Sequence, residues 1–178
     1  MTDILLCFLY LAFTGILGFF LGRLLPKHWF DEKNPLFQSR SFEQNGKIYE
    51  KLGVRSWQNR VPDMSRILPG LLPPKRYAGC TPEALPRMIT ETCIAEFIHL
   101  LLAFTGLGCL LIHQGAAGVI ITLLYELGNL PYILIQRYNR PRLVRIRDKY
   151  RTRTLKHPLD ISEGEPIHAN HPNLNIEL

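Results

Sequence analysis

Ionisable and amide side chains interrupt two long apolar segments in the second half of the chain. Glu91, Glu96 and His99 lie in the first segment, and Glu126 and Asn129 lie in the second. A charged group at membrane depth costs at least about 2.5 kcal/mol on insertion scales, so such residues usually face a cavity or a partner and often take part in chemistry. These five residues are the first candidates for a functional site.

Helical spacing places these residues on two polar faces. At about 100° per residue, Glu96 and His99 share one face of a helix, while Asn129 shares a face with Gln136 and has Glu126 beside it. The complete stripes are Thr92, Glu96, His99, Ala103 and Gly106 in the first segment, and Tyr125, Asn129, Tyr132 and Gln136 in the second. We expect the two stripes to face each other across a helical hairpin.

A carboxylate near an imidazole suggests acid–base chemistry. It can orient the ring and raise its basicity, so we predict that His99, oriented by Glu96 or Glu91, removes a proton from a substrate. The same residues are also suited to plain interhelical hydrogen bonds, worth about 0.6 kcal/mol each. A Glu-x-x-His pair also occurs in di-iron bundles, but those need a second copy that this chain lacks, so no metal site is predicted.

The segment that follows is rich in arginine and amide groups: Gln136, Arg137, Asn139, Arg140 and Arg142. Arginine binds phosphate and carboxylate groups through paired N–H donors. We expect Pro141 to end the helix, so that the guanidinium groups converge at the membrane surface and hold an anionic group such as a donor phosphate. Arginines that follow a membrane span are also common as plain anchors on the cytoplasmic side, and that interpretation stays open.

The elements that must position these residues are membrane helices. Hydrophobic residues make up 47% of the 178 residues, and they concentrate in segments 4–25, 93–112 and 117–135. A helix of about 20 residues crosses a bilayer. No basic region precedes the first segment and no small-residue cleavage pattern follows it, so we expect a retained anchor. The predicted fold is an all-α membrane protein with about three transmembrane helices, the last two forming a hairpin that turns at residues 113–115.

Charge distribution predicts the topology. All 21 lysines and arginines lie in segments 23–87 and 137–156. Because basic loops stay in the cytoplasm, the N-terminus and the hairpin turn are expected outside. The net charge of +6 then reflects orientation and contact with anionic lipids rather than nucleic-acid binding, for which no motif is visible.

These patterns divide the chain into an anchor at 1–25, a cytoplasmic interfacial region at 26–90, a transmembrane hairpin with its arginine-rich exit at 91–143, and a basic, then polar tail at 144–178. Within the interfacial region, segment 42–57 has the composition of a short amphipathic helix. Segment 61–86 contains many prolines and is expected to form a loop against the headgroups or over a site. The four cysteines show no disulfide or zinc spacing.

Three blocks of sequence resemble the bacterial glycosyl-4,4'-diaponeurosporenoate acyltransferase family. They are FEQNGKIYEKLGVRSWQNRVPD at 42–63, MITETCIAEFIH at 88–99 and NLPYILIQRYNRPRL at 129–143. Besides the candidates above, the match covers Lys51, Arg55 and Trp57, and we include Arg55 and Trp57 among the substrate-binding candidates. Glu126, the proline-rich stretch and the tail lie outside the resemblance.

The resemblance implies a membrane acyltransferase that moves a fatty acyl group to a sugar hydroxyl of a glycosylated lipid. We expect the chain in the bacterial cell membrane, with membrane lipids, a glycolipid acceptor and an acyl donor as its partners. Because no Ser or Cys stands out as a nucleophile, we expect direct transfer from acyl-CoA or another acyl thioester as cosubstrate, without a bound cofactor. Two alternatives stay open: a non-enzymatic subunit that presents a glycolipid, and another lipid-modifying enzyme such as a membrane methyltransferase. The sequence does not indicate an oligomeric state.

Overall fold

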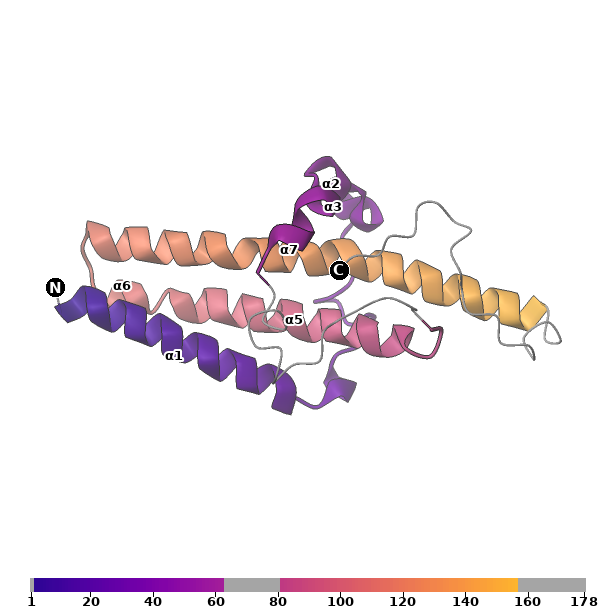
Figure 1. Cartoon of the computed structure of the whole chain (residues 1–178), viewed down its shortest axis with the longest axis horizontal. Coiled ribbons are helices and arrows are strands. Elements are labelled where there is room, and N and C mark those ends of the chain that lie inside the picture. Colours follow the sequence, from indigo (N-terminus) through magenta and orange to yellow (C-terminus); the bar gives the residue numbers. More distant parts are fainter. Residues whose placement is uncertain (1, 63–80, 157–178) are drawn as a thin grey trace. The chain divides into compact units, whose positions relative to one another are not determined.

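The computed structural model describes residues 2–62 and 81–156 (Figure 1). Contacts between Cα atoms divide the chain into two units. Unit 1 consists of Met1–Gln38 and Thr90–Arg137, and unit 2 consists of Ser39–Ile89 and Tyr138–Leu178. Most of the predicted proline-rich loop at 61–86, and the polar tail from residue 157 onward, lie outside the described residues.

Three helices in the described residues are long and apolar enough to cross a membrane. They are α1, Thr2–Leu24; α5, Leu85–Gly106, which continues through the short α6, Cys109–Ile112; and α7, Ala116–Lys156. No strand occurs in residues 2–62 or 81–156. The predicted all-α fold with three spans is therefore confirmed, although α5 begins eight residues earlier and α7 ends well beyond the apolar segments that we identified.

In unit 1, α1 packs along α5, and the two helices run side by side in Figure 1. Leu21 and Leu25 contact a cluster formed by Cys93, Ile94 and Ile98 on α5. Phe30 and Phe37, from the segment after α1, complete this cluster: Phe30, Phe37, Cys93, Ile94 and Ile98 are all buried. Burial of these side chains fixes the segment after α1 against α5, where the polar stripe of α5 begins.

The other end of unit 1 is held by polar contacts at a break between α5 and α6. The Tyr10 hydroxyl donates to the carbonyl of Thr105 at 2.8 Å, which satisfies one of the carbonyls that the end of α5 leaves open. Asp3 lies 3.9 Å from His113 in the turn between α6 and α7. The N-terminus and the hairpin turn thus lie at the same end of unit 1, as the charge pattern predicts.

Helix α7 continues through Pro131 and Pro141, so the prediction that Pro141 ends the helix is wrong. A proline inside a helix removes one hydrogen bond and clashes with the carbonyl four residues earlier, at a cost of about 3 kcal/mol, but it does not prevent the next turn from forming. In unit 2 the fully buried Leu143 packs against Leu85, Met88 and Ile89 and stabilises the turn that follows Pro141.

The remainder of unit 2 corrects the predicted amphipathic helix at 42–57. The segment consists of three short pieces, and a fourth follows it: η2, Ser41–Gly46; α2, Lys47–Lys51; α3, Val54–Trp57; and then η3, Gln58–Arg60. Gln44 and Asn45 have φ angles of 49° and 55°, and Gly46 and Gly53 have 91° and 67°. These values are left-handed, so no continuous α-helix can pass through them.

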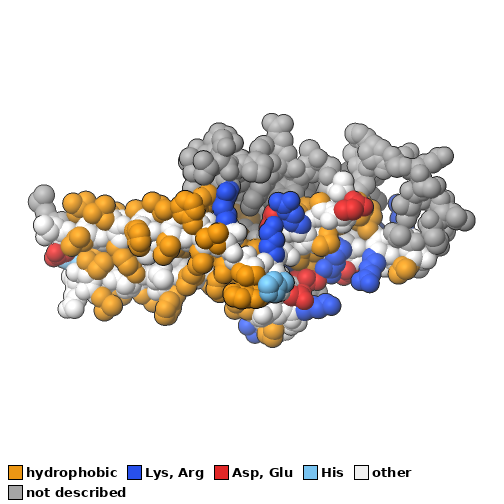
Figure 2. All heavy atoms as spheres, turned by 90° about the horizontal axis from the view of Figure 1, so that it is seen from below, with side chains coloured by type: hydrophobic (Ala, Val, Ile, Leu, Met, Phe, Trp, Pro, Cys, Tyr) orange, Lys and Arg blue, Asp and Glu red, His pale blue; other side chains and the backbone are white. Residues whose placement is uncertain are grey.

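The surface of unit 1 suits a lipid environment. Its exposed side chains include Leu5, Phe8 and Phe13 on α1 and Phe104 on α5, and hydrophobic side chains are numerous on the face seen in Figure 2. A soluble surface rarely exposes so large an apolar area. Cys7, Cys93 and Cys109 are buried.

Candidate functional site

The predicted polar stripes of α5 and α7 do face each other within unit 1. The Nδ1 atom of His99 lies 3.0 Å from the Oδ1 atom of Asn129. The imidazole also stacks on the Tyr132 ring, with 4.4 Å between ring centroids and 5° between ring planes. A hydrogen bond and a stacked ring from one helix thus fix both the position and the tilt of His99.

The tautomer of His99 follows from the neighbours of Asn129. The Nδ2 group of Asn129 donates to the carbonyl of Tyr125 at 3.1 Å. A carbonyl oxygen only accepts, so this contact assigns the amide nitrogen and leaves Oδ1 facing the imidazole as an acceptor. His99 must therefore carry its hydrogen on Nδ1, and the basic lone pair of its neutral ring is on Nε2. At Nδ1 the ring is oriented by the Asn129 amide; that Glu96 or Glu91 also orients it stays a prediction.

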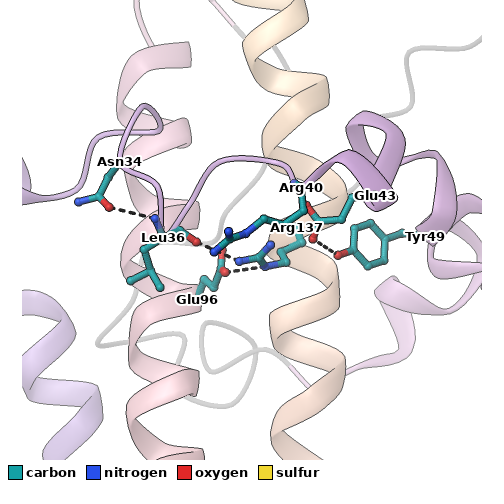
Figure 3. Close-up of polar contacts among 7 residues, drawn as sticks. All are labelled: Asn34, Leu36, Arg40, Glu43, Tyr49, Glu96 and Arg137. Atoms are coloured by element: carbon teal, nitrogen blue, oxygen red, sulfur yellow. Dashed lines mark hydrogen bonds and ion pairs between the residues drawn. The ribbon is translucent and has the colours of Figure 1, made fainter.

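Glu96 forms a buried ion pair with Arg137. Arg137 donates from Nε to Glu96 Oε1 at 2.7 Å, and the side chains of Glu96 and Arg137 are 0% and 17% exposed. Arg137 also donates from Nη2 to the carbonyl of Leu36 at 2.9 Å (Figure 3). The amide of Leu36 in turn donates to Asn34 Oδ1 at 3.0 Å. Arg137 thereby joins α5, α7 and the segment after α1.

Glu126 lies one helical turn before Asn129, where α5 and α7 approach closely. A Cβ atom built on Gly106 would lie 2.6 Å from the Tyr125 ring and 2.9 Å from Glu126 Oε1, so only glycine fits there without a shift. The Oε1 atom is buried and has no hydrogen-bond partner among the residues that the structure describes. Glu126 and Asn129 both line a cavity of about 260 Å³.

Unit 2 has a polar cluster of its own on α7, which includes three residues that we predicted. Asn139, 1% exposed, donates from Nδ2 to Gln58 Oε1 at 3.2 Å. The Arg142 guanidinium lies 4.7 Å from the centre of the Tyr138 ring. Arg140 is also buried. Among the described residues, Tyr138 Oη, Asn139 Oδ1 and Arg142 Nη1 are buried without a hydrogen-bond partner.

Unit 2 contains a buried carboxylate, that of Glu43, which was not predicted. Glu43 is 2% exposed and accepts hydrogen bonds from the Tyr49 hydroxyl at 2.5 Å and from the Arg40 backbone amide at 2.6 Å (Figure 3). This arrangement closes the start of η2 in the manner of a capping box, a structural role. The acidic residue three positions after Arg40 was a signal for it in the sequence.

The remaining candidates lie on both units. Arg55 is exposed, and Trp57 donates from its ring nitrogen to the Leu52 carbonyl at 3.1 Å, both in unit 2. Glu91 and Gln136 are half-buried in unit 1. In residues 2–62 and 81–156, no group of three or more His, Cys, Asp or Glu side chains is arranged to hold a metal ion. Gln58 and the Leu36 carbonyl carried no recognisable signal, because only the folded loops bring them to α7.

Comparison with known proteins adds an independent finding. Residues 26–149 match the family model described as glycosyl-4,4'-diaponeurosporenoate acyltransferase. Curated glycosyl-4,4'-diaponeurosporenoate acyltransferases of Staphylococcus aureus strains N315, MRSA252 and USA300 are each 31% identical over 129 residues, which is 71% of this chain and 76% of each relative. No solved structure matches the chain. The matched range contains every candidate residue in both polar clusters.

Proposed function

Since this chain belongs to the glycosyl-4,4'-diaponeurosporenoate acyltransferase family and is a membrane acyltransferase, we propose that it transfers a fatty acyl group to a sugar hydroxyl of a carotenoid glycoside or a similar glycolipid. The acceptor is then a lipid, and an acyl donor is the second substrate. Membership of an acyltransferase family favours this function over a presenting subunit or a methyltransferase.

The reaction is assigned to the polar cluster of unit 1, and the observation that carries this assignment is the contact of His99 with Asn129. His99 Nε2 takes the proton of the sugar hydroxyl while the hydroxyl oxygen attacks the carbonyl carbon of the acyl thioester. The C–S bond breaks, and the leaving thiolate receives the proton from the imidazolium. General-base catalysis of this kind contributes about 10²- to 10⁴-fold in rate.

Arg137 gives the same cluster a fixed positive charge. Its contacts with Glu96 and with the Leu36 carbonyl hold the guanidinium in one orientation. A fixed cation near the reacting carbonyl would stabilise the negative charge that develops on the carbonyl oxygen. In this proposal Glu96 and Asn129 are positioning residues, one for Arg137 and the other for His99.

The polar cluster of unit 2 is proposed to bind the head of the acyl donor. This stretch of α7 carries two arginines, Arg140 and Arg142, beside the Asn139 amide. A thioester carrier such as coenzyme A offers phosphate oxygens and amide groups, and guanidinium groups are well suited to bind its phosphates. We further propose that both clusters belong to a chain in the bacterial cell membrane whose basic regions face the cytoplasm, where acyl thioesters are made.

The function is tested by acyl transfer in nanodiscs. The purified chain receives a glucosylated carotenoid acid and an acyl-CoA, and mass spectrometry of the lipids is expected to show an acceptor heavier by one acyl group. His99→Ala should abolish this product, whereas His113→Ala, at the hairpin turn, should leave the yield unchanged. Full activity of a folded His99→Ala variant would contradict the catalytic assignment. Absence of product with every acyl donor tried would contradict the function itself.

The donor site is tested separately. Arg142→Met removes the charge and keeps much of the apolar stem, so KM for the acyl-CoA should rise about tenfold, the usual effect of losing a hydrogen bond to a charged group. KM for the glycolipid should stay unchanged. The exposed Arg145→Met serves as the matched control. An equal rise of KM for both substrates would assign Arg142 to a general structural role.

A further inference from the structure

The last part of α7, which belongs to unit 2, carries more positive charge than the proposed donor site uses. Residues 138–156 include eight lysines and arginines and a single acidic residue, Asp148. Arg147 donates to the Asp148 carboxylate from Nε at 3.0 Å, so that carboxylate already has a basic partner. Helix α7 has 41 residues, about twice the number that a bilayer crossing needs. Its last part therefore extends beyond the span and can meet a partner outside the membrane core.

Three of these basic side chains form one stripe along the helix. At about 100° per residue, Arg145, Lys149 and Arg153 fall within about 80° of one another, in line with Arg142 of the donor site. All three side chains are exposed. No ion pair within residues 2–62 and 81–156 involves any of them. We call these three residues the basic stripe.

The apolar face of the same helical turns is used for packing within unit 2. Leu143 is fully buried against Leu85 and Ile89, and Ile146 and Tyr150 pack against the same cluster. A helix that lies in a bilayer interface instead buries its apolar face among the lipids. The basic stripe must therefore recognise its partner through charge. This favours an acidic protein surface over insertion into the membrane.

The spacing of the basic stripe indicates which acidic surface fits. Residues three or four positions apart on a helix have Cβ atoms about 5–6 Å apart. Acidic residues at the same interval on a second helix can pair with all three members of the stripe. From Arg142 to Arg153 the helix rises about 16 Å, which is too far for one phosphate group to contact both ends. The phosphates of a free nucleotide carrier would thus leave most of the stripe unused.

We propose that the basic stripe docks a small acidic protein that carries the fatty acyl group as a phosphopantetheine thioester. The inference rests on the proposed function and extends it, because it names the carrier of the acyl donor. The phosphate of the phosphopantetheine arm then occupies the donor site, which adjoins the stripe through Arg142. Docking itself forms no covalent bond, and the thioester reacts as described above.

The first test measures binding independently of turnover. The full chain, in nanodiscs of phosphatidylcholine alone, is titrated with a fluorescently labelled bacterial acyl carrier protein charged with a palmitoyl chain. We expect saturable binding that weakens as the salt concentration rises, because exposed charges are screened. A carrier protein whose acidic helix residues are changed to amides should not bind.

Charge reversal locates the binding surface. Lys149→Glu should raise Kd for the carrier protein about fivefold, and reversal of all three charges of the stripe should raise it about 10²-fold. Arg151→Glu makes the same kind of change at another exposed position, on the opposite face of the helix. This control should change Kd by less than about twofold.

Acyl transfer distinguishes docking from a structural role. With the acyl carrier protein as donor, the triple variant should lose about 10²-fold in kcat/KM. With acyl-CoA as donor, kcat/KM should stay unchanged, because the free thioester needs only the donor site. Equal losses with both donors would assign the stripe to the stability of α7 and overturn the proposal.

Three further results separate the possibilities. A native chain that uses acyl-CoA but does not bind the carrier protein would overturn the inference and leave the acyltransferase function intact. Stripe-dependent binding of the carrier protein, in a chain that transfers no acyl group from any donor, would support the docking surface and contradict the proposed function. Phosphatidylglycerol in the nanodisc might instead stabilise the native chain and not the triple variant; together with absent carrier binding, that result would assign the stripe to lipid headgroups and overturn the proposal.

Discussion

At the scale of single residues, each atom that the proposed chemistry uses is fixed by a neighbour with fixed hydrogen-bonding character. The Tyr125 carbonyl determines the orientation of the Asn129 amide, and that amide determines which nitrogen of His99 carries the hydrogen. The Glu96 carboxylate and the Leu36 carbonyl hold two different nitrogens of Arg137. The position of the Arg137 cation and that of the His99 base therefore depend on residues that do not themselves react.

Replacement of Asn129 by Leu tests the positioning of His99. The two side chains have similar size, but leucine accepts no hydrogen bond, so the imidazole loses its preferred tautomer and orientation. We expect kcat to fall about 10²-fold, the lower end of the range for general-base catalysis, with little change in either KM. Steady-state acyl transfer in nanodiscs measures both constants. Unchanged kcat in a folded Asn129→Leu variant would show that His99 is oriented by other means.

The ion pair of Glu96 and Arg137 is expected to matter for stability as well as for catalysis. Arg137→Met deprives the buried Glu96 carboxylate of this partner, which typically lowers the free energy of unfolding by about 3–5 kcal/mol. Adding Glu96→Gln removes the buried charge and should recover part of that loss. Thermal unfolding in detergent compares the two variants. A double variant less stable than Arg137→Met alone would contradict this account.

At the scale of the elements, the function depends on how closely α5 approaches α7. The stripes could be predicted from the sequence, because residues three and four positions apart share a helix face, and Glu96, His99 and Asn129 follow that rule. The continuation of α7 through Pro141 could not be predicted, because the packing of Leu143 after the proline compensates for the missing hydrogen bond. The contact of Gln58 with Asn139 could not be predicted either. Residues 44–46 have left-handed backbone angles that change the direction of the chain, and composition does not reveal them.

Two glycines provide a matched test of the close approach. Gly106→Ala places a methyl group 2.6 Å from the Tyr125 ring, so we expect the free energy of unfolding to fall by about 1–3 kcal/mol, as for other overpacked sites. A Cβ on Gly128 would meet nothing within 4 Å. Gly128→Ala should therefore leave stability unchanged or raise it by up to about 1 kcal/mol through helix propensity. Equal effects at the two positions would argue against a tight contact at Gly106.

At the scale of the whole molecule, the three spans found in the described residues and the one-sided distribution of basic residues predict an orientation that labelling can test. A cysteine at Gln114, in the hairpin turn, should react with a membrane-impermeant maleimide in intact cells. A cysteine at Glu50 should react only after the cells are permeabilised. Both variants are made in a background without native cysteines. Labelling of Glu50→Cys in intact cells would reverse the predicted topology.

The contact between Arg137 and Leu36 has a consequence for how such proteins diverge. The oxygen that receives the guanidinium belongs to the main chain, while the leucine side chain is 40% exposed. Position 36 can therefore exchange almost freely during evolution without disturbing the contact, except for proline, which would remove the amide that donates to Asn34. A comparison of side-chain identities among relatives would therefore detect Arg137 but not the Leu36 carbonyl that accepts its hydrogen bond. We expect the contact to restrict substitution at Arg137 and insertions between positions 30 and 38.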